Sequence, residues 1–125
     1  MYEQYIENAE EKLGAAKYLF GGGFYNDAAS RAYYSMFYSA RALLSTKEIH
    51  PRKHKGVILK FGLEFVKEGF VEVVYGHTLT HAKDRREVAD YGIGSKISEE
   101  EAESIVEDAE RFLERIKKAI AEMKR

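Results

Sequence analysis

The chain has 125 residues, the length of one domain, and its hydrophobic content of 45% beside a charged content of 33% is typical of a globular protein. The formal net charge of -1 excludes nucleic-acid binding through bulk positive charge, although it does not exclude a local basic patch. The absence of cysteine excludes disulfides, thiolate catalysis and zinc–thiolate sites.

The composition favours helices over strands, because one proline and no tryptophan stand beside many Ala, Glu, Lys and Arg residues. The amino terminus lacks the basic start and apolar run of a signal peptide. No stretch approaches the roughly 18 apolar residues that a membrane span requires. We therefore expect a single all-α domain over residues 1–125, located in the cytoplasm and without membrane contact.

The first two helices are separated by glycines. Apolar residues recur at steps of three and four over residues 2–20, which predicts the first helix, and the glycines at 21–23 should end it. A second helix is predicted over about residues 24–47. Asn26 or Asp27 is the expected cap of its first amides, because both side chains can accept hydrogen bonds there.

Three further helices follow Pro51. The third is predicted over about residues 53–67, where two glycines weaken the pattern, and the fourth over about residues 70–89. The last helix has a defined start, because Ser98 can cap it and Glu101 completes a capping box. The expected architecture is an up-and-down four-helix bundle with one additional short helix.

Two faces of the second helix have different compositions. Small and aliphatic residues predict a core face, formed by Ala29, Ala32, Met36, Ala40, Leu43 and Leu44. Steps of three and four place a second stripe on one side of the helix, formed by Arg31, Tyr34, Tyr38, Arg41 and Ser45. Guanidinium groups bind phosphate and phenol rings stack on bases, so this stripe suits a nucleotide or RNA. The alternative is that it covers a bundle groove or a dimer seam.

The segment at residues 24–44, FYNDAASRAYYSMFYSARALL, resembles the signature helix of HEPN-domain proteins. Residues 61–66, FGLEFV, and 85–91, RREVADY, are also similar to a small archaeal and bacterial branch of that superfamily. The resemblance implies a HEPN-like helical bundle that forms a homodimer. It also implies pairing with a separate minimal nucleotidyltransferase, often as toxin and antitoxin, and a relation to endoribonucleases that need no metal cofactor.

The ribonuclease motif of that superfamily is an arginine and a histidine with about four to six residues between them, and the histidine would transfer protons. In this chain Tyr38 follows Arg31 at the place of the histidine, and Asp90 follows Arg85 in the same way. A phenol titrates at about pH 10, and an ionised aspartate cannot donate a proton at neutral pH. The candidate catalytic residues are therefore Arg31, Arg85 and Asp90, without a complete motif.

Four histidines offer other chemistry. His50 and His54 bound the basic run HPRKH, which suits a phosphate or a catalytic role, and the alternative is a solvated loop and helix start. His77 and His81 lie four residues apart and could share a metal, but the glutamate of metalloproteases is absent. We interpret this pair as buried, hydrogen-bonded imidazoles or part of a polar groove, and predict no metal.

The leading hypothesis is a HEPN-type regulatory module that binds a nucleotide or RNA in a groove between the second and fourth helices, close to a homodimer seam. The predicted polar wall of this groove contains Arg31, Tyr34, Tyr38, Arg41 and Arg85. Asp90 could pair with Arg85 or Arg86, or orient Arg31 across the groove. The alternatives are an endoribonuclease toxin that uses one of the four histidines, and a structural dimerisation module without a ligand.

Overall fold

The computed structural model describes residues 1–92, 94 and 96–124, and within these ranges it contains helices and no strand. The all-α prediction is confirmed, as is the bundle of four long helices with one short helix. The elements are α1 (Tyr2–Gly21), α2 (Tyr25–Ser45), α3 (His54–Phe61), the π-helical turn η1 (Gly62–Val66), α4 (Val73–Tyr91) and α5 (Glu99–Met123). None of the described helices is long and apolar enough to cross a membrane.

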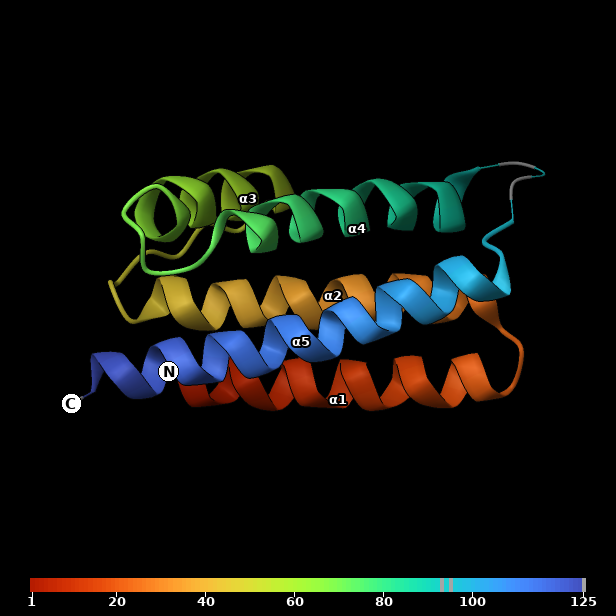
Figure 1. The fold of residues 1–125 in the computed structure, drawn as a ribbon, viewed down its shortest axis with the longest axis horizontal. Coiled ribbons are helices and arrows are strands. Elements are labelled where there is room, and N and C mark those ends of the chain that lie inside the picture. The colour runs from red at the N-terminus through yellow and green to blue at the C-terminus, as the bar shows by residue number, and fades with distance from the viewer. Residues whose placement is uncertain (93, 95, 125) are drawn as a thin grey trace.

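The central element is α2, which contacts α1, α3, α4 and α5. Figure 1 shows α2 between α1 on one side and the α3–α4 layer on the other, with α5 running alongside. Small side chains allow this close approach of several helix axes. Every residue of the predicted core face is fully buried: Ala29, Ala32, Met36, Ala40, Leu43 and Leu44.

The turn between α1 and α2 depends on one glycine. Gly23 has φ of +82°, in the left-handed region, and Phe24 donates its backbone N–H to the Leu19 carbonyl at 2.9 Å. This arrangement is a Schellman-type helix end, in which a left-handed residue lets later amides satisfy the last carbonyls. The predicted end of the first helix is therefore confirmed, and α2 begins directly after the turn.

The predicted capping role of Asn26 and Asp27 is wrong, because both residues lie inside α2 and Phe24 occupies the N-cap position without a side-chain bond. Asn26 instead joins two later segments. Its amide nitrogen donates to the Ala89 carbonyl at 3.3 Å, and its amide oxygen accepts from the backbone N–H of Ile97 at 2.8 Å. Asn26 therefore ties the end of α4 and the approach to α5 against α2.

Two other boundaries differ from the predicted ones. The third helix ends at Phe61 and continues as η1, and α4 begins at Val73 rather than near residue 70. At the start of α5 the predicted cap is confirmed, since Ser98 Oγ accepts from the backbone N–H of Glu101 at 3.1 Å. The Glu101 carboxylate contacts Ser98 Oγ and also pairs with Arg85, so it helps to join α5 to α4.

Candidate functional site

One side of α2 is left open by its neighbours. Towards α1, Ser35 Oγ donates to the Ala9 carbonyl at 2.8 Å, and towards α4, Ser30 Oγ donates to Asp90 at 3.4 Å. Between these contacts lies a surface that we call the open face of α2, formed by Arg31, Tyr34, Tyr38 and Arg41. Arg31 is exposed and the other three side chains are half-buried. Ser45, the last member of the predicted stripe, is buried.

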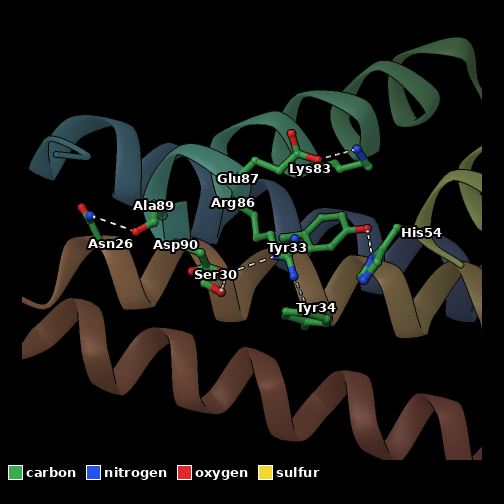
Figure 2. Close-up of polar contacts among 10 residues, drawn as sticks. All are labelled: Asn26, Ser30, Tyr33, Tyr34, His54, Lys83, Arg86, Glu87, Ala89 and Asp90. Carbon is green, nitrogen blue, oxygen red and sulfur yellow. Dashed lines mark hydrogen bonds and ion pairs between the residues drawn. The ribbon is translucent and has the colours of Figure 1, made fainter. Parts of the chain in front are cut away.

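Tyr34 connects this face to α4 through Arg86. Arg86 Nη2 donates to the Tyr34 hydroxyl at 2.6 Å, and the guanidinium carbon lies 5.3 Å from the centroid of the Tyr34 ring. Arg86 Nε lies 3.2 Å from Asp90 Oδ2, so Asp90 forms its ion pair with Arg86. This pairing is one of the alternatives that the sequence predicts for Asp90. Figure 2 shows Arg86 between these two partners.

His54, the first residue of α3, contacts the same region of α2. The Tyr33 hydroxyl and His54 Nδ1 are 2.7 Å apart, and the imidazole packs against the Phe37 ring with a centroid distance of 4.5 Å. The Tyr33 and Tyr34 ring centroids lie 5.5 Å and 5.6 Å from that of His54. Figure 2 shows His54 and Arg86 on the same side of α2. We call Ser30, Tyr33, Tyr34, His54, Arg86 and Asp90 the α2–α4 polar cluster.

The surroundings of this cluster set the charge of its members. Burial lowers the pKa of His54, and the nearby Arg86 and Lys83 cations lower it further, so the imidazole is neutral at neutral pH. Burial raises the pKa of Tyr33, which stays protonated. Burial alone disfavours the charge of Arg86, but the Tyr34 hydrogen bond and the Asp90 carboxylate outweigh it and raise the pKa of Arg86. A neutral base therefore stands near a permanent cation.

Among the other predicted wall residues, Arg41 and Arg85 contact helices outside the cluster. Arg41 donates to the Tyr5 hydroxyl of α1 at 3.1 Å, and its guanidinium lies 4.8 Å from the Tyr5 ring centroid. Arg85 pairs with Glu101 of α5 at 2.7 Å. Tyr38 packs against the Phe37 ring, with centroids 5.5 Å apart. The structure therefore brings Tyr34 to α4, leaves Arg31 in solvent, and directs Arg41 and Arg85 elsewhere.

His50, His77 and His81 lie outside the cluster. All three side chains are exposed, so the expectation that His77 and His81 are buried is wrong: this side of α4 faces away from α2. Within the described ranges, no group of three or more His, Cys, Asp and Glu side chains is arranged to hold a metal ion. Of the four histidines, only His54 lies in the α2–α4 polar cluster.

The sequence pattern predicts Arg86 only as a partner for Asp90, and it does not single out Tyr33. The spacing of α4 contains the missing signal, because Leu79 and Ala82 are buried and Arg86 follows them at helical steps on the same side. Arg85 immediately precedes Arg86, so it lies about 100° away around the helix and faces α5. Tyr33 likewise immediately precedes Tyr34, so it lies about 100° away from that member of the predicted stripe around α2.

Comparison with known families decides what this bundle is. The family model described as HEPN domain matches residues 2–119. The chain belongs to the HEPN domain family. The resemblance found in the second helix is thereby confirmed over nearly the whole chain.

Named relatives of this HEPN domain occur in archaea and bacteria. "Putative toxin MJ0605" of Methanocaldococcus jannaschii is 54% identical over 118 residues, which cover 94% of this chain and 87% of that protein. "Putative toxin MJ0142" of the same organism is 43% identical over 93% of this chain and 79% of its own length. A UPF0332 protein of Thermotoga maritima is 36% identical over 98% of this chain and 93% of its own length.

Proposed function

We propose that this HEPN domain is the toxin-like component of a two-protein system, and that it binds a nucleotide or RNA on the open face of α2 beside α4. Two similar proteins carry the name "Putative toxin", which supports the toxin-like part of the proposal. The implied antitoxin is a minimal nucleotidyltransferase, and the implied assembly is a homodimer whose seam adjoins the open face. RNA as the ligand implies action in the cytoplasm.

The observation that carries the ligand is the contact between Tyr34 and Arg86. It joins a half-buried phenol of α2 to a guanidinium of α4, with Tyr38 and the exposed Arg31 on the same face of α2. Guanidinium groups bind phosphate oxygens, and partly exposed phenol rings offer surfaces on which bases stack. This combination favours an anionic, aromatic ligand over a neutral metabolite.

The proposal is tested by titrating the protein with nucleotides and with short fluorescein-labelled single-stranded RNA at low and high salt. Binding should weaken as salt rises, because phosphate contacts release counterions. Arg31→Ala should reduce the affinity about threefold or more, the effect of losing a charge-assisted contact. Arg111→Ala is the matched control, since Arg111 is an exposed arginine of α5. Equal losses in the two variants, or binding that ignores salt, would contradict the proposal.

The partner is tested through the neighbouring gene. If that gene encodes a small nucleotidyltransferase, the two proteins should copurify after joint expression, and the partner should relieve any growth defect that this HEPN domain causes alone. Two proteins that elute separately, with growth unaffected by either, would argue against the pair.

A second candidate function, metal-independent RNA cleavage, is favoured by the position of His54. Its Nδ1 contacts Tyr33, which leaves Nε2 to accept the proton of a ribose 2′-hydroxyl. The 2′-oxygen then bonds to phosphorus, the bond to the 5′-oxygen breaks, and that oxygen takes a proton from water. The products are a 2′,3′-cyclic phosphate and a 5′-hydroxyl.

Purified protein incubated with cellular RNA and a metal chelator distinguishes this enzyme from a binding module. Cleavage by the wild-type protein should disappear in His54→Asn and persist in His50→Asn, because His50 is exposed outside the cluster. The enzyme is excluded if the RNA stays intact while a catalytically active HEPN nuclease cuts it under the same conditions.

A further inference from the structure

The guanidinium of Arg86 is held firmly by one partner and loosely by another. Nη2 donates to the Tyr34 hydroxyl at 2.6 Å, a short and well-formed hydrogen bond. Nε is buried and lies 3.2 Å from Asp90 Oδ2, yet it makes no hydrogen bond with any described residue, because its N–H is not aligned with that oxygen. Tyr34 therefore positions the guanidinium. The Nε–H, by contrast, has the Asp90 carboxylate nearby but forms no aligned hydrogen bond to it.

Asp90 is itself weakly held in this position. Its side chain is 29% exposed, and its contact with Ser30 Oγ is long, at 3.4 Å. Asp90 is also the penultimate residue of α4. A carboxylate is disfavoured there, because the partial charge at the carboxyl end of a helix is negative. Asp90 itself would therefore lose little on rotating into solvent, provided that another anion takes its place beside Arg86.

We propose that Arg86 is an anion-binding group beside the open face, and that Asp90 is an internal anion which a phosphate diester displaces. This inference rests on the proposed function, in which RNA binds beside α4. The Nε–H and one N–H of Nη2 lie on the same edge of a guanidinium and form a fork that matches two phosphate oxygens. Nη2 carries a second N–H, with which it can keep its bond to Tyr34. Phosphate binding thus replaces a misaligned ion pair with an aligned fork.

Asp90, which stands where the ribonuclease motif has its histidine, therefore has a different role in this chain. Asp90 keeps Arg86 paired when no ligand is present, since an unpaired guanidinium that is only 14% exposed would be costly. The same carboxylate lowers the affinity for RNA, because the ligand must compete with it. Arg86 and Asp90 together set how tightly this surface binds phosphate.

The test compares Asp90→Asn with Asp84→Asn, using anisotropy of a short fluorescein-labelled single-stranded RNA. Both variants remove one negative charge from α4, but Asp84 is exposed and outside the cluster. Asp90→Asn should bind about twofold to fivefold more tightly than wild type, the range expected for removing a partly exposed ion-pair competitor. Asp84→Asn should show a smaller gain, and Arg86→Lys combined with Asp90→Asn should lose the gain altogether.

The outcomes separate this inference from the proposed function. If neither wild type nor Asp90→Asn binds the RNA, the proposed function fails and the inference with it. If wild type binds while Asp90→Asn gains no more than Asp84→Asn, only the inference fails. A second measurement needs no variant at Asp90: the Nε–H NMR signal of Arg86, assigned by its loss in Arg86→Lys, should shift when the RNA is added to wild type. An unchanged signal during measurable binding overturns the inference.

Discussion

At the scale of single residues, His54 shows how packing changes chemistry. Its half-buried imidazole packs against the rings of Tyr33, Tyr34 and Phe37. The charged groups that face it come from α4, and the cations Arg86 and Lys83 there outweigh Glu87. An imidazolium is therefore disfavoured twice, by loss of water and by like charge. The same surroundings that suit His54 to act as a base also make the fold sensitive to acid.

Acid should destabilise the protein through His54. Its pKa is lower in the folded chain than the ordinary value of 6.5, so the unfolded chain binds more protons as the pH falls below about 6.5. The contribution of the neutral imidazole is complete above that pH and is lost on acidification. Thermal unfolding from pH 7.5 to pH 5 should thus show a falling melting temperature in wild type and a flatter profile in His54→Gln.

His50→Gln is the control, because His50 is exposed, and it should follow the wild-type profile. Carboxylates with lowered pKa, such as Glu72 and Glu87, lose their contributions only below about pH 4.5. Parallel profiles for wild type and His54→Gln above pH 5 would show that the imidazole is not disfavoured by its surroundings.

At the scale of elements, two neighbouring glycines at the end of α1 have opposite requirements. Gly21 is the last residue of the helix and has open space where a Cβ would stand, whereas Gly23 has a φ of +82°. Gly21→Ala should raise the free energy of unfolding by about 0.5–1 kcal/mol. Gly23→Ala should lower it by about 1–2 kcal/mol, because L-residues are strained in the left-handed region. Urea denaturation measures both, and changes of the same sign would contradict this account.

Asn26 is the element-scale joint between α2, α4 and α5. Asn26→Ala should lower the free energy of unfolding by about 1–3 kcal/mol, because the part-buried N–H of Ile97 and carbonyl of Ala89 lose their partner. Asn8→Ala in the exposed part of α1 is the control, and it should change stability by less than about 0.5 kcal/mol. Denaturant midpoints decide between these outcomes. Equal effects at the two positions would contradict the claim that Asn26 stabilises the contact of α2 with α4 and α5.

At the scale of the whole molecule, we expect a second copy to pack beside the open face of α2, in a seam that includes Tyr38 at the edge of that face. Tyr38 is half-buried within one chain, and aromatic residues are enriched at interfaces. We expect a homodimer in analytical ultracentrifugation, converted towards monomer by Tyr38→Glu, because a carboxylate would be buried in the seam. Tyr18→Glu on α1, where the side chain is 84% exposed, should leave the dimer intact. A wild-type monomer at all concentrations would contradict the proposed seam.

Local patterns in the sequence determined much of this protein. Helical periodicity predicted the long helices, the glycines at 21–23 predicted the end of α1, and Ser98 predicted the start of α5. The motif of α2 indicated the family, which the match over residues 2–119 confirmed. These features are readable because each depends on residues within a few turns of one another.

Only the tertiary structure decided which side chains share a site. Arg85 and Arg86 are adjacent in sequence, yet one faces Glu101 of α5 and the other Tyr34 of α2, because a step of one residue turns a helix by about 100°. His54 joins the cluster through Tyr33, 21 residues away, and Asn26 contacts Ile97 across 71 residues. Such pairings depend on how the helices are rotated against each other, and that rotation is set by the packing of the whole core rather than by any one segment.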